Sequence, residues 1–169
     1  MDITQLILDD HAEQRRLFAI IEQLTPDQTD GLKAVWGRLR ALLDTHAEAE
    51  ERFFYPELLK IGQGADGEDP VDETKDAIKD HNEIRDTAAA VDKEELGSAA
   101  WFKAVAAANK ANSDHMGEEE RQGLTDFRQH ADLALRHKIA VDFIRFECEH
   151  LTGVKPVDRD VDEYVLENS

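Results

Sequence analysis

Two pairs of residues in the sequence have the spacing of a metal chelate. In each pair a glutamate follows a histidine by four positions, as His46 with Glu50 and His115 with Glu119. On a helix, residues four positions apart lie on the same face, so each pair would present a nitrogen and an oxygen in one direction. The pairs therefore predict two metal-binding helix faces.

The two pairs belong to an internal duplication. The dipeptide Asp10-His11 recurs as Asp80-His81, and residues 46–52 (HAEAEER) recur as residues 115–121 (HMGEEER). The interval between the two histidines is nearly the same in both copies. Two copies at such a long offset are too few for a solenoid, so they predict two helical hairpins that pair face to face in one bundle.

The interior of such a bundle needs cations. An ionised glutamate in an apolar interior is unfavourable unless its charge is compensated, and two facing glutamates also repel each other. Four imidazoles with two carboxylates form a mixed nitrogen and oxygen environment that suits iron or manganese, and zinc less well. We therefore expect two metal ions, with a ligand set of His11, His46, Glu50, His81, His115 and Glu119.

Several of these residue types also have an ordinary structural interpretation. A single histidine on an apolar stripe is usually a hydrogen-bonded core residue, but four at duplicated spacing favour ligands. Glu51 and Glu120 follow the inward glutamates by one position and turn about 100° away on a helix. That position predicts either solvent exposure or support of a ligand from outside. The Glu-x-x-His pattern of ferritin-like bundles occurs only once, at Glu147 and His150.

Four segments of helical periodicity position the ligands. One histidine lies on the apolar stripe of each segment, and Ser98 is a suitable N-cap for the fourth. Pro56 is expected to break or kink the second segment, and residues 62–70, rich in glycine and aspartate, are expected to form a loop. The sequence therefore predicts an all-α, up-and-down four-helix bundle whose helices cover about residues 3–25, 30–56, 72–96 and 98–123.

Composition excludes some classes of partner. The chain has 169 residues, enough for one domain, and a formal charge of −18. That charge opposes binding to nucleic acid or to an anionic membrane surface. Cys148 is the only cysteine, so no internal disulfide or thiolate metal site is expected. With no basic leader and no long apolar run, a cytoplasmic location is expected.

The duplicated motifs resemble those of a known family. Asp10-His11, then His46-x-x-x-Glu50-Glu51 leading to Phe54-Tyr55-Pro56, then Asp80-His81 and His115-x-x-x-Glu119-Glu120 are similar to the hemerythrin family in its cation-binding HHE form. The resemblance covers roughly residues 3–124. It implies an oxo- or hydroxo-bridged di-iron centre that meets dioxygen or related small molecules. It further implies terminal ligation by His11, His46, His81 and His115, with Glu50 and Glu119 as bridges.

The sequence departs from the oxygen-carrying members of that family. Those proteins have an additional histidine in the third helix, where this chain has Arg85, and a bridging aspartate where it has Glu119. One imidazole fewer argues against simple oxygen carriage and leaves coordination positions open for chemistry. Tyr55 is a candidate catalytic residue or additional oxygen ligand, because Pro56 could turn it inward, although on an ideal helix it points away from the Glu50 face.

The C-terminal part of the chain carries no duplicated pattern. Apolar residues between Phe127 and Leu151 predict one or two further helices. We therefore expect a four-helix bundle over residues 1–124, a helical extension packed on it over residues 125–152, and a polar tail without recognisable chemistry over residues 153–169. The side chains expected to lie on the surface or to serve only in packing are His130, His137, Cys148 and His150.

Two classes of function follow from these residues. In the first, the chain is a di-iron enzyme that reacts with hydrogen peroxide in catalase or peroxidase fashion, or with dioxygen or nitric oxide, and so relieves oxidative stress. In the second, it binds, stores or senses dioxygen or iron without catalysis. A purely structural metal site fits less well, because such sites usually use a closed set of thiolate ligands. The expected partners are these small molecules, and no oligomeric state is predicted.

Overall fold

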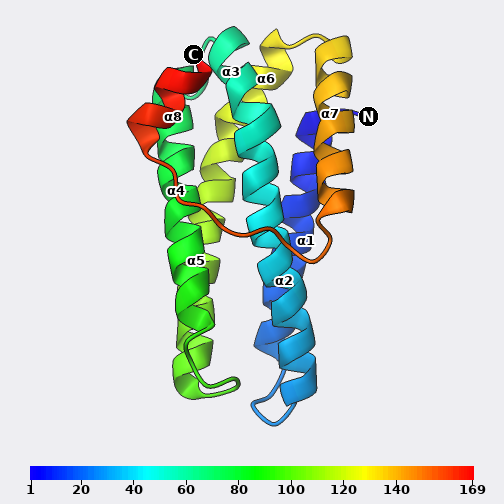
Figure 1. Ribbon diagram of the computed structural model, residues 1–169, viewed down its shortest axis with the longest axis vertical. Helices are drawn as coiled ribbons and strands as arrows, with labels where there is room; N and C mark the ends of the chain where they lie inside the picture. The colour runs from blue at the N-terminus through cyan, green and yellow to red at the C-terminus, as the bar shows by residue number, and fades with distance from the viewer.

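Four long antiparallel helices form the body of the molecule in the computed structural model, which describes residues 1–169 (Figure 1). α1 and α2 form one hairpin, α4 and α5 form the second, and the two hairpins pack together. This arrangement confirms the predicted four-helix bundle. The four helices are α1 (Ile3–Gln23), α2 (Thr29–Ala49), α4 (Pro70–Val91) and α5 (Ala99–Arg121).

Polar side chains define where these helices begin. Asp2 caps α1, Asp69 caps α4 and the predicted Ser98 caps α5, each by accepting hydrogen bonds from backbone N–H groups of the first turn. The helix expected to reach residue 96 ends earlier, at Val91. The chain then turns through Gly97, whose φ of 78° favours glycine.

The second helix continues past the position where Pro56 was expected to break it. A π-helical turn, η1 (Glu50–Phe54), follows α2 and leads into α3 (Tyr55–Ile61). Pro56 lies in the first turn of α3, where its missing N–H has no partner to lose. Of the break or kink expected at Pro56, a break does not occur, because the π turn leads directly into a new helical segment.

Three further helices follow the bundle. α6 (Gly123–His130) and α7 (Leu133–Glu149) occupy the region where further helices were predicted, and α7 packs against α1 and α2. The polar tail contains a third, α8 (Val161–Asn168), which packs against α4 (Figure 1). None of the helices combines the length and the apolar character that a membrane span requires.

The hydrophobic core consists of two clusters separated by a polar layer. The lower cluster contains Trp36 and Trp101 and lies toward the two hairpin loops. The upper cluster contains Phe54, Phe127 and Phe143 and joins the bundle to the C-terminal helices. On α1, α2 and α4 the predicted ligands lie between residues of the two clusters, and on α5 they follow the residues of the lower cluster. The fold therefore encloses the polar layer with apolar side chains on both sides.

Candidate metal centre

The structure brings the six predicted ligands together in the middle of the bundle. Two groups of three among these six residues have ligand atoms within 4.8 Å of one another, and a third group joins His46 to Asp10 and Glu147. Glu50 belongs to both groups, whereas Glu119 belongs to neither, although its Oε2 lies 3.3 Å from Nε2 of His11. All six are almost fully buried. The two groups are His11 with His46 and Glu50, and Glu50 with His81 and His115.

Several inward-facing atoms of the centre converge without a hydrogen-bond partner, whereas the Nε2 atoms of His81 and His115 contact each other at 3.2 Å. Nε2 of His46 lies 2.9 Å from Oε1 of Glu50, yet neither atom has a partner in hydrogen-bond geometry. Nε2 of His11, Oε2 of Glu50 and Oε2 of Glu119 are also buried without such a partner. Buried polar atoms are rarely left in this state. The donor set therefore fits metal ions, which would accept lone pairs from all of these atoms.

Each of the four imidazoles turns its other nitrogen toward a carboxylate. The Nδ1 atoms of His46 and His115 face Asp10 at 3.1 Å and Asp80 at 3.7 Å. The hydrogen bond between His46 and Asp10 favours a proton on Nδ1 and leaves the Nε2 lone pair free for a metal ion, as is usual for metal-binding histidines, whereas Asp80 lies beyond hydrogen-bond distance of His115. Asp10 and Asp80 are the aspartates of the duplicated Asp-His dipeptides. Their role is therefore to orient a histidine on the neighbouring helix of the same repeat.

The other two imidazoles are oriented across the repeats. Nδ1 of His81 lies 2.8 Å from Glu51, and Nδ1 of His11 lies 3.0 Å from Glu120. Each glutamate comes from the repeat opposite to its histidine. Of the two roles expected for Glu51 and Glu120, support of a ligand from outside is the one that the contacts favour.

The carboxylates around the centre change the proton affinity of the imidazoles. Burial lowers the pKa of His46, but Glu50 and Asp10 outweigh burial and hold it well above its usual value. Burial also lowers the pKa of His81, while Glu50 and Glu51 raise it to about 9. Protons on these rings thus compensate Glu50, whose own pKa is raised by burial but held well below its usual range by the two histidines. Metal ions would have to displace these protons.

Glu51 also joins the centre to parts of the chain that the sequence did not place there. Its side chain accepts hydrogen bonds from Nη2 of Arg85, at 2.8 Å, and from Nε of Arg159. The hydroxyl of Tyr164 on α8 donates to the backbone carbonyl of Glu51 at 2.5 Å. The tail, in which no chemistry was recognised from the sequence, thus supports the centre from outside: Arg159 holds the carboxylate that orients His81, and Tyr164 holds the backbone of the same residue.

Tyr55 faces the centre, which is the inward orientation considered for it, and the outward orientation of an ideal helix does not apply because a π turn precedes this residue. The π turn places the N–H of Tyr55 on the carbonyl of Glu50, five residues earlier, so the two residues lie on the same side. The phenol is fully buried and donates to Oε1 of Glu119 at 2.6 Å. Burial and the nearby Glu119 and Glu50 raise the pKa of Tyr55 well above its usual value, so the phenol is protonated in this state.

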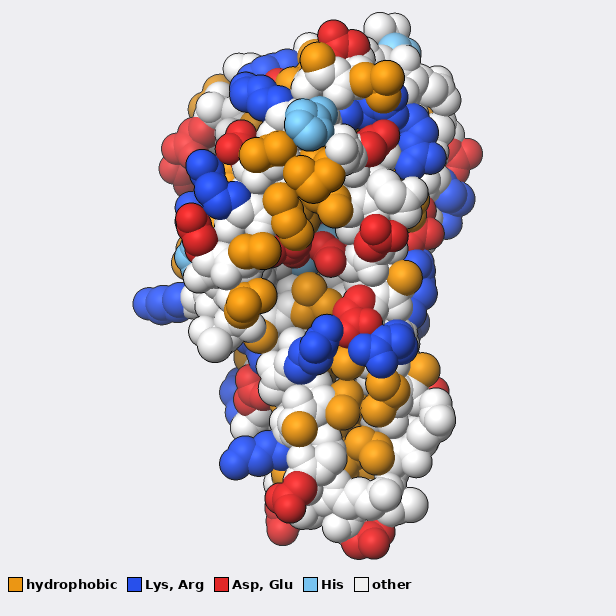
Figure 2. Space-filling model, turned by 90° about the vertical axis from the view of Figure 1, so that its right-hand side faces the viewer, with side chains coloured by type: hydrophobic (Ala, Val, Ile, Leu, Met, Phe, Trp, Pro, Cys, Tyr) orange, Lys and Arg blue, Asp and Glu red, His pale blue; other side chains and the backbone are white.

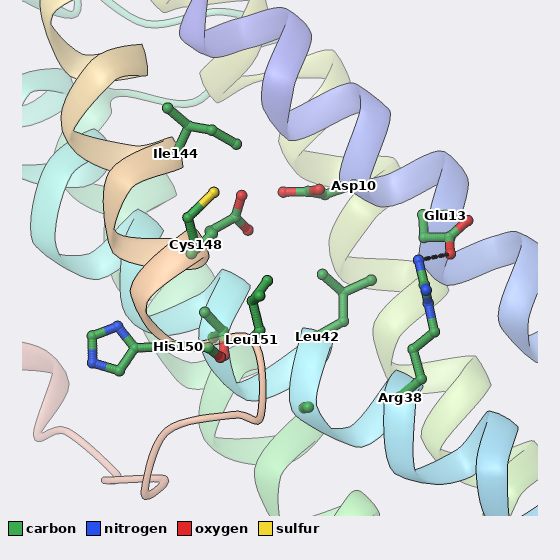
Figure 3. A pocket seen from close by; sticks show the side chains of 11 residues that line it. Asp10, Glu13, Arg38, Leu42, Ile144, Cys148, His150 and Leu151 are labelled. Atoms are coloured by element: carbon green, nitrogen blue, oxygen red, sulfur yellow. Dashed lines mark hydrogen bonds and ion pairs between the residues drawn. The ribbon is translucent and has the colours of Figure 1, made fainter.

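A pocket of about 450 Å³ lies between α1, α2 and α7, beside the centre. Asp10, the partner of His46, points into it from α1, and Arg38 forms an ion pair with Glu13 at its rim (Figure 3). Glu147 on α7 also lines it, with one oxygen buried and unpartnered. Figure 2, viewed from the side on which α7 lies, shows acidic side chains in a hollow at mid-height. A small molecule that contacts Asp10 in this pocket would lie next to the residue that forms a hydrogen bond with the predicted ligand His46.

The remaining histidines lie outside the centre. Nδ1 of His130 contacts Asp126 on its own helix, His137 is exposed near the N-terminus, and Nδ1 of His150 contacts the carbonyl of Phe146. Cys148 is exposed. None of the four contacts a predicted metal ligand through a hydrogen bond.

Comparison with known proteins identifies one family. The family described as the hemerythrin HHE cation binding domain matches residues 2–125, which include all six predicted ligands, Tyr55, and the carboxylates on the four Nδ1 atoms. No curated protein and no solved structure matches the chain.

Proposed function

Because the chain belongs to the hemerythrin HHE cation-binding family, we propose that its centre holds two iron ions and reacts with hydrogen peroxide as a catalase or peroxidase. Dioxygen and nitric oxide are alternative oxidants for the same centre. The observation that carries the proposal is the convergence of unpartnered Nε2 and glutamate oxygens in one buried layer. Four imidazoles and two carboxylates suit iron, and manganese or zinc could replace it.

The proposal assigns a role to each group of residues. His11 and His46 would bind one iron and His81 and His115 the other, while Glu50 and Glu119 would bridge them. When bound, the two irons would pass two electrons to one peroxide and regain two, from a second peroxide in the catalase reaction or from an external reductant in the peroxidase reaction. Oxidative stress in a cytoplasm is the setting we propose, since a chain with a single cysteine suits a reducing compartment.

We include Tyr55 in the proposed machinery. Its hydroxyl holds Oε1 of Glu119 at 2.6 Å and leaves Oε2 directed toward His11. The phenol would therefore orient the bridging carboxylate and keep a proton within the buried centre. Tyr55→Phe should lower peroxide turnover while the bound iron and the melting temperature stay close to their original values. Unchanged turnover would remove Tyr55 from the proposal.

Metal analysis together with an oxygen electrode tests the central claim. The purified protein should contain two irons per chain and should consume added hydrogen peroxide, with release of oxygen in the catalase reaction and only with an added reductant in the peroxidase reaction. Glu50→Ala combined with Glu119→Ala should abolish iron binding, whereas His137→Ala, which removes an exposed histidine outside the centre, should retain both irons. Iron retained in the double variant would contradict the proposed bridging carboxylates, and a protein that binds no iron would contradict the whole proposal.

A second function, sensing of dioxygen or iron, is favoured by one specific contact. Arg159 and Tyr164 connect the C-terminal tail to Glu51 and therefore to His81. A change at the centre could be transmitted to α8 through this connection. Two irons without peroxide turnover, together with faster amide hydrogen exchange in α8 on loss of the metal, would support sensing. Peroxide turnover with no change in α8 would support the enzyme.

A further inference from the structure

Glu73 on α4 is an acidic side chain buried without a partner. It is 4% exposed, and neither of its carboxyl oxygens has a hydrogen-bond partner. It lies two helical turns before His81, on the same face of α4. Burying an acid in this way is unfavourable for folding, and none of the contacts described above depends on Glu73. The residue therefore calls for a functional explanation.

The chain makes room for this carboxyl group. Gly123 begins α6, and a Cβ atom at this position would overlap Oε1 of Glu73. The φ angle of Gly123 is not in the left-handed region, so backbone conformation does not require glycine here. The absence of a side chain at residue 123 is thus what permits Glu73 to occupy its position.

Glu73 lines a small cavity that reaches the predicted metal centre. Tyr55, His115 and Glu119 line the same cavity. Its volume is about 10 Å³, which is room for one water-sized particle. A divalent metal ion that has lost its hydration shell is of this size or smaller. The cavity therefore has room for one such ion beside Glu73.

An acidic groove connects this cavity to the protein surface. The groove lies between the neighbouring helices α4 and α5 (Figure 1) and has a volume of about 480 Å³. Asp76, Asp80 and Glu118 line both the groove and the inner cavity. Two lysines, Lys79 and Lys110, also line the groove, and Lys110 pairs with Asp114. Acidic side chains thus continue from the solvent to the centre.

We propose that divalent metal ions enter the centre along this groove and that Glu73 binds each ion in transit before it reaches Glu119. Carboxylate oxygens suit hard divalent cations, and a cleft lined by one sign of charge raises the local concentration of the opposite ion. The destination of the ions rests on the proposed function. The route and the role of Glu73 rest on the cavity, the groove and the unpartnered carboxyl group.

The rate of metal loading tests the role of Glu73 separately from the capacity of the centre. Metal-free protein is mixed with cobalt(II) in a stopped-flow spectrometer, and the visible absorption of the bound ion is followed. Glu73→Gln preserves the size of the side chain and replaces a carboxyl group, which can release its proton when it binds a cation, with an amide, which cannot. It should slow loading about tenfold or more, with two ions per chain still bound at the end point. Raising the ionic strength should slow loading of the original protein, because salt screens the groove.

Two matched variants complete the experiment. Asp76→Asn changes an exposed groove residue and should slow loading by a smaller factor, so the proposal is tested even if Glu73→Gln impairs folding. Glu147→Gln changes an acidic residue in the pocket on the α7 side and should leave the rate unchanged. Loading slowed only by Glu147→Gln, or by neither Glu73→Gln nor Asp76→Asn, would overturn the proposed route alone. An original protein that binds no metal ion would overturn the proposed function as well.

Discussion

Glu51 and Glu120 occupy the same position in the two repeats. They therefore allow the same role to be compared at a buried and at a partly exposed position. Each orients a histidine of the opposite repeat through its Nδ1 atom. The side chain of Glu51 is fully buried and pairs with Arg85, which is 4% exposed. The side chain of Glu120 is 28% exposed and pairs with Arg15, which is 45% exposed. The two substitutions to alanine should therefore affect folding very differently.

The expected magnitudes follow from the partner that each substitution leaves behind. Glu51→Ala strands the guanidinium of Arg85 in the interior, where Asn82 remains as a neutral partner, and such a loss costs about 3–5 kcal/mol. Glu120→Ala leaves Arg15 in contact with water, where losing an ion pair costs about 0–1 kcal/mol. Metal affinity should fall about 10–100-fold in both variants, because each loses the group that orients an imidazole.

Urea unfolding of the metal-free protein measures the first effect, and competition with a chromophoric chelator measures the second. Replacing Arg85 by methionine in the Glu51→Ala protein should recover about 2 kcal/mol, because the stranded charge is removed, while the metal affinity stays low. Equal destabilisation by Glu51→Ala and Glu120→Ala, or no recovery on removing Arg85, would contradict the claim that Glu51→Ala leaves a buried, uncompensated charge on Arg85.

Three further outcomes are expected. When the free metal concentration is about one hundred times the dissociation constant, removing the metal should lower the free energy of unfolding by about 2.7 kcal/mol. Calorimetry should then show a melting temperature lower by about 5–11 °C, and an unchanged melting temperature would argue against a metal bound to the folded state. Trp101→Ala should destabilise the protein by about 3–5 kcal/mol in urea, because it empties part of the lower core, and a change in metal content of the refolded variant would contradict the separation of core and centre. Burial raises the pKa of Glu73 from 4.5 to about 8, so between these values the folded chain retains a proton that the unfolded chain releases, and stability falls as the pH rises. Urea unfolding of the metal-free protein should therefore show Glu73→Gln gaining stability relative to the original protein from pH 5 to pH 8, and a constant difference would contradict the raised pKa.

The bundle and its ligand layer could be predicted because they depend on local periodicity. His46 and Glu50 share a face whenever residues 46–50 are helical, and the duplication repeats this relation at His115 and Glu119. The two core clusters follow from apolar residues on either side of the histidines along each helix. Glu73 also left a signal, because it precedes His81 by eight positions on the same stripe, but an acid at that position reads equally well as a solvated residue near a helix start.

The features that were not predicted are a helical turn widened by one residue and contacts between residues far apart in the sequence. The π turn at 50–54 shifts Tyr55 toward Glu50, and no change in the apolar pattern marks a turn widened by one residue. Arg159 and Tyr164 reach Glu51 from more than one hundred positions away in the chain. Their sequence context, a polar segment after Pro156, resembles a surface tail. Only the packing of α8 against α4 explains their role.

These missed contacts make the two halves of the duplicated centre unequal. Nδ1 of His81 faces a carboxylate that is itself held by Arg85, Arg159 and the tail, whereas Nδ1 of His11 faces Glu120, which remains partly open to water. A more firmly held carboxylate fixes its imidazole more rigidly and restricts exchange of the metal that the imidazole binds. The duplicated ligands therefore account for the two metal positions that we propose, and the C-terminal helices, which are not duplicated, predict that the two positions differ in lability.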